Sequence, residues 1–331
     1  MLDPFSGSGT TAVEAVRLGR SAIAVDRITA CVELTTAKLH MLRYGLSKSV
    51  ADRLAEALTW EHLCSTDAAG LRGEGADPQL ATWFAPSTLG QLRFLWKLIE
   101  DEPDEVQRAI LVVAFGDVLF ACASPGKATT ASGKRRRHHW GWVADNVRPQ
   151  RLVERSAIQL FVSRLGHFRK LEVELNWSQS LVLQQDARAL GLDSESVDLV
   201  VTSPPYIGVI DYTRANRLLY LWMDWPFDSD RKDEIGARFK RSRLNTVAEY
   251  RADMTRAWTE IVRVMRPGAY CAVVIGESRR QPGTVAQTLG DLAELAAPVW
   301  GPVLRNPSRR RVSERIGREA VEYVAVFQKP W

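Results

Sequence analysis

The chain has 331 residues, of which 46% are hydrophobic and 25% charged, a composition typical of a folded globular protein. Its net charge of +5 and pI of about 9.1 fit a polyanionic partner without requiring one. No apolar run reaches the ~18 residues of a membrane span, and the opening Met1-Leu2-Asp3-Pro4 differs from the basic and then apolar order of a signal peptide. We therefore expect a cytoplasmic protein.

The N-terminal segment has the order of a nucleotide-binding βαβ unit. A glycine loop, Asp-Pro-Phe-Ser-Gly-Ser-Gly-Thr-Thr, occupies Asp3 to Thr11. Apolar residues at helical spacing from Ala12 to Leu18 predict a helix, which Gly19 ends. The run from Ser21 to Asp26 then predicts a buried strand that finishes on an acid.

Each part of this unit suits a nucleotide. Glycines allow close approach of the backbone, and the helix N-terminus offers free N–H groups to an anion. Asp26 would accept hydrogen bonds from ribose hydroxyls. A glycine loop alone is also compatible with a purely structural turn.

A mainly helical insertion follows a helix expected over residues 28–44. Ser87 is the expected N-cap of a helix with apolar positions from Leu92 to Ile99, and Pro103 opens another that runs past Val118. We expect the apolar stripes of these helices to form a core rather than a ligand site.

Three basic runs are candidates for contact with nucleic acid. The densest lies beside two tryptophans, an arrangement that suits phosphate contacts together with stacking on exposed bases. A solvated loop whose tryptophans pack into the core is the alternative. The candidate residues are Lys134, Arg135, Arg136, Arg137, Trp140, Arg241, Arg243, Arg309, Arg310 and Arg311.

The α/β pattern resumes with a strand at Leu181 to Leu183 that ends near Asp186, and with a buried strand at Val197 to Val201. Thr202-Ser203-Pro204-Pro205-Tyr206 follows directly, and its two prolines end the strand because neither can donate to a ladder. The carbonyls of this loop would face the carboxyl end of the sheet, where ligands bind in α/β folds. Taken alone, the loop also fits an ordinary polyproline segment.

The remaining pattern predicts alternating helices and strands. They are a helix over 211–222, a long helix over 247–265 closed by Arg266-Pro267-Gly268, a strand over 269–275, a helix over 285–295 and strands over 299–304 and 322–327. The four cysteines, Cys31, Cys64, Cys122 and Cys271, are widely spaced without a Cys-x-x-Cys pair, which favours free buried thiols and neither a disulfide nor a metal site.

The pair of motifs at Asp3 to Thr11 and Thr202 to Tyr206 resembles the amino-methylating DNA methyltransferases of the N4-cytosine and N6-adenine type. In that family the first motif binds S-adenosylmethionine, which implies a cofactor role for Asp3, Pro4, Phe5, Ser6, Gly7, Gly9, Thr10 and Thr11. Asp26 matches the ribose-binding acid and Asp186 the position near the adenine. The second motif implies that Ser203, Pro204, Pro205 and Tyr206 hold the target base.

The resemblance implies an α/β fold, with a Rossmann-like methyltransferase sheet covered by helices on both faces plus the helical insertion. The expected domains are 1–46 and 171–331, which form the catalytic part, and 47–170, the candidate target-recognition region. It also implies that the chain acts on DNA at specific sites, and it allows for a companion restriction endonuclease.

The chemistry of the motif follows from the weak nucleophilicity of an exocyclic amine. Acceptors at Ser203 and at the Pro204 carbonyl would take the two amine hydrogens, turning the nitrogen lone pair towards the methyl group for direct transfer. Tyr206 would stack on a base flipped out of the duplex. Serine before Pro-Pro-Tyr is typical of the N4-cytosine branch, whereas carbon-5 methylation would need a thiolate, commonly in a Pro-Cys pair that is missing from this sequence.

Several alternatives stay open at this point. They are an N6-adenine enzyme, an RNA methyltransferase, a non-catalytic DNA-binding relative, and a dinucleotide oxidoreductase, since Gly7-x-Gly9-x-x-Ala12 with Asp26 also fits that fingerprint. Only Met1 and Leu2 precede Asp3, whereas a strand of about five residues and an N-terminal helix are expected there. We therefore expect the sequence to be a shortened version of a longer methyltransferase.

Overall fold

The computed structural model describes residues 1–64, 78–124, 149, 151–168, 179–277, 281–305 and 322–331. These residues form two compact units. Unit 1 comprises Met1–Thr35, Asn176–Tyr212 and Asp230–Trp331, and unit 2 comprises Thr36–Leu175 and Thr213–Ser229. The domain boundaries expected after residues 46 and 170 stay a prediction.

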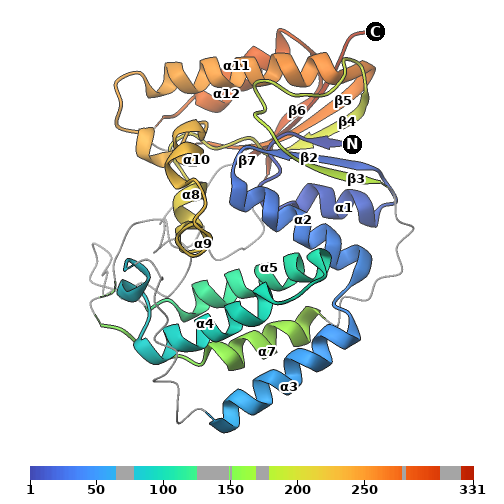
Figure 1. Ribbon diagram of the computed structural model, residues 1–331. Coiled ribbons are helices and arrows are strands. Elements are labelled where there is room, and N and C mark those ends of the chain that lie inside the picture. The colour runs from blue at the N-terminus through green and yellow to red at the C-terminus, as the bar shows by residue number, and fades with distance from the viewer. Residues whose placement is uncertain (65–77, 125–148, 150, 169–178, 278–280, 306–321) are drawn as a thin grey trace. The chain divides into compact units, whose positions relative to one another are not determined.

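Unit 1 is built on one mixed sheet (Figure 1), which in the described part of the chain has seven strands in the order β3-β2-β1-β4-β5-β7-β6. The strands are β1 (Leu2–Asp3), β2 (Ala22–Asp26), β3 (Ser180–Gln184), β4 (Val197–Thr202), β5 (Met265–Gly276), β6 (Ala297–Arg305) and β7 (Glu322–Gln328). The first five are parallel, and β7 runs antiparallel between β5 and β6. The expected Rossmann-like α/β sheet is confirmed.

Helices cover both faces of this sheet (Figure 1), with α1 (Thr10–Arg17) on one face and α11 (Thr246–Val264) and α12 (Thr284–Ala293) on the other. Although β1 has only two residues, Leu2 is fully buried and pairs with Ile23 of β2 and Val200 of β4. The short strand is therefore an interior strand of the sheet, between β2 and β4.

Three details of the sequence prediction were wrong. The helix α4 (Pro86–Glu100) takes Ala85 as its N-cap, not Ser87, because Pro86 fits the first helical position, where an N–H is not needed. Arg266-Pro267-Gly268 lies inside β5, because the Gly268 N–H pairs with the Lys329 carbonyl (3.0 Å) and extends the strand. The helix expected over 211–222 is two, α8 (Tyr212–Ala215) and α9 (Arg217–Met223), separated at Asn216.

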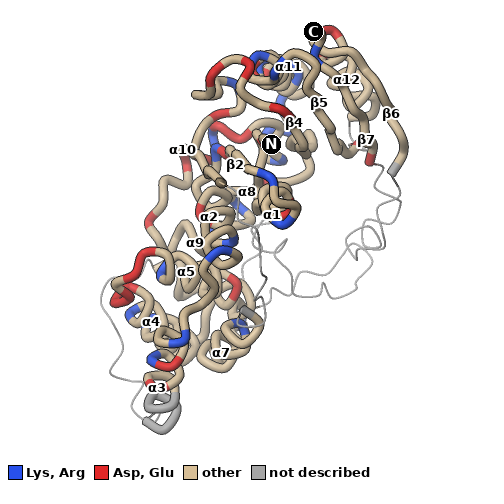
Figure 2. Tube along the Cα trace, turned by 90° about the vertical axis from the view of Figure 1, so that its right-hand side faces the viewer, with Lys and Arg blue, Asp and Glu red and all other residues tan. Residues whose placement is uncertain are grey.

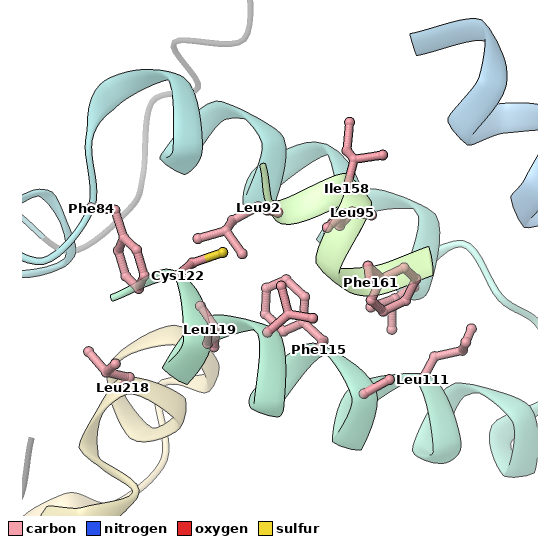
Figure 3. Close-up of a cluster of buried hydrophobic side chains, with 14 of the residues drawn as sticks. Phe84, Leu92, Leu95, Leu111, Phe115, Leu119, Cys122, Ile158, Phe161 and Leu218 are labelled. Atoms are coloured by element: carbon pink, nitrogen blue, oxygen red, sulfur yellow. The ribbon is translucent and has the colours of Figure 1, made fainter. Parts of the chain in front are cut away.

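Unit 2 is helical and has its own core (Figure 3). Its packing elements are α3 (Lys48–Cys64), α4, α5 (Glu105–Cys122), α7 (Ala157–Phe168) and α9. Asp104 caps α5 by accepting hydrogen bonds from the N–H groups of Val106 (2.8 Å) and Gln107 (3.1 Å), which explains why the helix begins there. The apolar stripes of the insertion are thus core, as the sequence predicted.

Three of the described helices have residues in both units: α2 (Thr29–Tyr44), α8 and α10 (Phe227–Asp233). None of the described helices is long and apolar enough to cross a membrane. Cys31, Cys122 and Cys271 are buried and not joined in a disulfide, and the side chain of Cys64 lies outside the described residues.

We predict that Phe115→Ala lowers the free energy of unfolding of unit 2 by about 3–5 kcal/mol. Phe115 is fully buried and contacts the rings of Trp96 and Trp222, with centroids 5.2 and 5.1 Å away. Val162→Ala on α7, where the side chain is 49% exposed, should change it by less than about 0.5 kcal/mol. Urea titration of the two variants checks this, and equal losses would contradict the assigned core.

Candidate functional site

A cleft with an empty volume of about 580 Å³ lies at the carboxyl ends of the parallel strands, and every residue that lines it belongs to unit 1. This is the edge at which α/β sheets bind ligands. The lining residues are Pro4, Phe5, Gly7, Asp26, Arg27, Ile28, Asp186, Ala187, Ser203, Pro205, Tyr212, Asp233, Glu234 and Ile235. Residues from both sequence motifs therefore meet in one space.

The two glycines of the glycine loop, Gly7 and Gly9, differ in how much space surrounds them. Both are in the left-handed region, with φ of 51° at Gly7 and 78° at Gly9. A Cβ atom at Gly9 would lie 2.7 Å from the Thr35 hydroxyl oxygen, whereas one at Gly7 would meet no atom within 4 Å. The Thr35 hydroxyl of α2 also donates to the Gly7 carbonyl (3.2 Å). Thr35 therefore packs against the loop at Gly9, whereas the position of a Cβ atom at Gly7 remains unoccupied.

A buried hydrogen bond joins the two motifs. The Thr202 hydroxyl at the end of β4 donates to Asp3 Oδ1 at the end of β1 over 2.7 Å. The same Asp3 oxygen accepts from the Phe5 N–H (3.1 Å), which bends the chain into the loop. Burial raises the pKa of Asp3, and hydrogen bonds from Thr202, Thr11 and Phe5 oppose that rise.

Asp26 holds the glycine loop against β2. Its Oδ2 accepts from the Gly7 N–H (2.8 Å) and its Oδ1 from the Ile28 N–H (2.9 Å). Burial raises the pKa of Asp26 to about 7, despite these hydrogen bonds. The backbone N–H of Arg27 also hydrogen-bonds to this carboxylate. Because a carboxylate has about four acceptor positions, Asp26 keeps capacity for a further donor.

Asp186, which follows β3, is paired with an arginine. Arg188 binds both of its carboxylate oxygens (2.8 and 2.5 Å) and reaches Asp253 of α11 with its other nitrogen (2.8 Å). Burial alone would raise the pKa of Asp186, but the hydrogen bonds and charge of Arg188 outweigh it and hold the pKa below its ordinary value. Asp186 is therefore an ionised group fixed at the cleft wall.

The Ser-Pro-Pro-Tyr loop is fixed by contacts with α11 and with β5, the strand next to β4. The Tyr250 hydroxyl of α11 donates to the Pro205 carbonyl (2.9 Å). The ring of Tyr206 lies so close to Gly276 of β5 that a Cβ there would be 2.4 Å from a ring carbon. Ser203 is exposed, and its hydroxyl lies 3.3 Å from that of Tyr206.

The predicted cofactor and base residues fall into two groups. Those that line the cleft are Pro4, Phe5, Gly7, Asp26, Asp186, Ser203 and Pro205. The others do not line it but belong to the same two loops or begin α1: Asp3, Ser6, Gly9, Thr10, Thr11, Pro204 and Tyr206. Their roles as binding residues stay predictions.

Most of the predicted DNA-binding residues lie outside the part of the chain that the structure describes. Lys134, Arg135, Arg136, Arg137, Trp140, Arg309, Arg310 and Arg311 lie outside the described residues. Arg241 and Arg243 are described and follow α10 in unit 1, where Arg243 also pairs with Glu249 (3.3 Å). Along α11 basic and acidic residues are mixed (Figure 2), so this helix offers no continuous basic stripe.

Sequence reasoning missed the part of the cleft wall that α10 and the residues after it supply. Arg27, directly after Asp26, pairs with Asp233 (2.7 Å) and with the buried Asp230 (3.6 Å). Glu234 accepts from the Tyr212 N–H (3.0 Å). The position of Arg27 after the strand-ending acid was a usable signal, but nothing in the sequence indicated that Asp233 lies opposite it.

The described residues contain no group of three or more His, Cys, Asp or Glu side chains that could hold a metal ion. The cleft lining combines the carboxylates of Asp26, Asp186, Asp233 and Glu234 and the Ser203 hydroxyl with apolar side chains such as Ile28 and Ile235. Such groups suit recognition of a polar organic molecule.

Comparison with known proteins adds one informative relative. No family model matches the sequence. The type II methyltransferase M.MjaII of Methanocaldococcus jannaschii is 24% identical over 260 residues, which are 71% of this chain and 47% of the relative. The chain resembles DNA methyltransferases. This confirms the resemblance suggested by the two motifs, while the chain spans about half the length of the relative it matches.

Solved structures give only loose likenesses. A methyltransferase dependent on S-adenosylmethionine from Methanosarcina mazei has a TM-score of 0.37 and 11% identity, covering 99% of this chain and 91% of that one. A candidate DNA modification methylase from Thermus thermophilus has a TM-score of 0.28 and 18% identity, covering 44% and 51%. Because both scores are below 0.5, we draw nothing further from them.

We predict that Asp26→Asn weakens the dependence of stability on pH. With a pKa of about 7 when folded and about 3.9 when unfolded, the wild-type carboxyl binds more protons in the folded state between these values. Its contribution therefore makes the free energy of unfolding fall as pH rises from about 4 to about 7, by at most about 1.4 kcal/mol per pH unit. Urea titrations at about pH 5 and about pH 7 give the free energy of unfolding at each pH. An equal change between the two pH values in wild type and variant would contradict the prediction.

Gly276→Ala should lower the free energy of unfolding by about 1–3 kcal/mol, because the new methyl group would overlap the Tyr206 ring. Gly290→Ala is the matched control. In α12 its methyl group would meet no atom within 4 Å, so helix propensity should raise the free energy of unfolding by about 0.5–1 kcal/mol. Thermal or urea unfolding decides, and a gain in both variants would refute the close packing of Tyr206.

Proposed function

We propose that this chain transfers a methyl group from S-adenosylmethionine to the exocyclic N4 of a cytosine flipped out of DNA. The observation that carries the proposal is the shared cleft, which is lined by Gly7 and Asp26 from the N-terminal βαβ unit and by Ser203 from the Ser-Pro-Pro-Tyr loop. A dinucleotide oxidoreductase would leave the second loop without a role. The similarity to M.MjaII, named as a type II methyltransferase, supports the same class.

The groups that line the cleft suit S-adenosylmethionine. The remaining acceptor capacity of Asp26 suits a ribose hydroxyl, and Ile28 and Ile235 give apolar surface for a purine ring. The Ser6 hydroxyl is buried and has no hydrogen-bond partner in the described residues, so it can still form a hydrogen bond. When bound, the cofactor supplies an electrophilic methyl group.

Ser203 and Pro204 supply the acceptors for the target amine. The Ser203 hydroxyl and the Pro204 carbonyl are the acceptors that we assign to the two amine hydrogens, and the hydrogen bond from Tyr250 to the Pro205 carbonyl holds their loop in place. Hydrogen bonds to these acceptors make the nitrogen more tetrahedral and aim its lone pair at the methyl group, and the nitrogen releases one proton after the transfer. Tyr206 then stacks on the base.

DNA is the partner that this reaction requires, and Arg241 and Arg243 are the described candidates for contact with its phosphates. Serine at position 203 favours cytosine over adenine, and N6-adenine methylation is the second candidate within the same chemistry. A companion restriction endonuclease and a cytoplasmic location stay predictions.

The proposal predicts N4-methylcytosine in unmethylated DNA of mixed sequence after incubation with the chain and S-adenosylmethionine. Ser203→Ala should reduce its rate of formation by about 100-fold, the cost of removing one preorganised polar group from a reacting centre. Ser196→Ala, at the amino end of β4, where the hydroxyl donates to the Asp193 carbonyl, is the control that should keep the wild-type rate. Mass spectrometry of the digested nucleosides measures all three.

Each other outcome has a definite meaning. N6-methyladenine would overturn the base assignment while keeping the reaction. Methyl transfer to RNA but not to DNA would overturn the substrate. DNA that binds with salt-dependent affinity but acquires no methyl group would overturn catalysis and favour a non-catalytic DNA-binding protein.

A further inference from the structure

Glu322, the first residue of β7, has a role that neither sequence motif indicates. It is the register partner of Gly276 on β5, the residue against which the Tyr206 ring lies. Its Oε1 accepts from the Tyr206 hydroxyl over 3.3 Å, and that hydroxyl lies 3.3 Å from Ser203 Oγ. The three side chains form a row from the sheet to the Ser-Pro-Pro-Tyr loop.

The carboxylate at one end of this row sets the direction of the two hydrogen bonds along it. An ionised carboxylate has lone pairs only, so Tyr206 must donate its single hydroxyl hydrogen to Glu322. The Tyr206 oxygen is then an acceptor towards Ser203, which donates its own hydrogen to it. Ser203 is left with its remaining lone pairs towards the cleft that it lines.

We propose that Glu322 is a positioning residue that makes Ser203 a hydrogen-bond acceptor towards the substrate. The inference rests on the proposed function and deepens it, because an amine donates and therefore needs an acceptor. A serine free to rotate would spend part of its time presenting its hydrogen to the amine. Glu322 removes that orientation, through Tyr206, before the base arrives.

The Tyr206 hydroxyl connects Glu322 to Ser203, and we call this row of two hydrogen bonds the relay. Both oxygen-to-oxygen distances, 3.3 Å, exceed the usual O–H···O range of about 2.5–3.0 Å. Hydrogen bonds at reacting centres are often long without substrate and shorten in the complex. The contact of the Tyr206 ring with Gly276 holds the hydroxyl near both partners meanwhile.

Glu322→Gln tests the proposal, because the amide keeps the size of the side chain but can both donate and accept. We expect kcat for N4-methylcytosine formation to fall about tenfold, because loss of a hydrogen-bond partner that orients a site residue typically lowers activity by at least that factor. The dissociation constant for S-adenosylmethionine, from calorimetry, should stay at the wild-type value. Glu195→Gln, whose side chain is exposed in the turn before β4, is the control expected to match wild type throughout.

A double-mutant cycle separates positioning from simple structural support. Tyr206→Phe removes the relay and should also lower kcat. Adding Glu322→Gln to Tyr206→Phe should then cause no further loss, since the carboxylate has no hydroxyl left to orient. Additive losses, or an unchanged kcat in Glu322→Gln beside an active wild type, would overturn the role of Glu322 alone. A wild type that forms no methylated base would overturn the proposed function, and this inference with it.

Discussion

The hydrogen bond between Thr202 and Asp3 is the contact on which the site depends. It joins two residues that are 199 positions apart and brings the ends of β1 and β4 together in the centre of the sheet. In a buried setting the unpaired hydroxyl and carboxylate would each be costly, so the pair strongly favours one relative position of the two strand ends. The glycine loop and the Ser-Pro-Pro-Tyr loop face one cleft because these ends are adjacent.

Much of the fold was predictable because local patterns and tertiary structure agree. The βαβ unit, the helix expected after Pro103 and the strand before Ser203 each carry a local signal, namely a glycine loop, a proline near a helix start and a proline stop. The prediction that Arg266-Pro267-Gly268 is a turn was wrong because here the local pattern and the tertiary structure disagree. The Pro-Gly pair normally signals a turn, yet pairing of Gly268 with Lys329, 61 residues further on, carries the strand through it.

The site was predictable only where the motif itself reaches the cleft. Asp26, Asp186 and Ser203 lie at strand ends, which the periodicity of the sequence locates. Asp233 and Glu322 reach the site through the tertiary fold from α10 and β7, and no spacing in the sequence connects them with Arg27 or Tyr206. Such partners are visible only once the sheet order is known, because β7 is inserted between β5 and β6.

The raised pKa of Asp26 has a consequence for ligand binding as well as for the fold. Near neutral pH part of the population carries a proton on this carboxyl. Ribose hydroxyls that donate to it favour the ionised form, so binding would expel a fraction of a proton into the solvent. The measured heat of association would then include the ionisation enthalpy of the buffer, and the cleft would act as a small proton donor each time it fills.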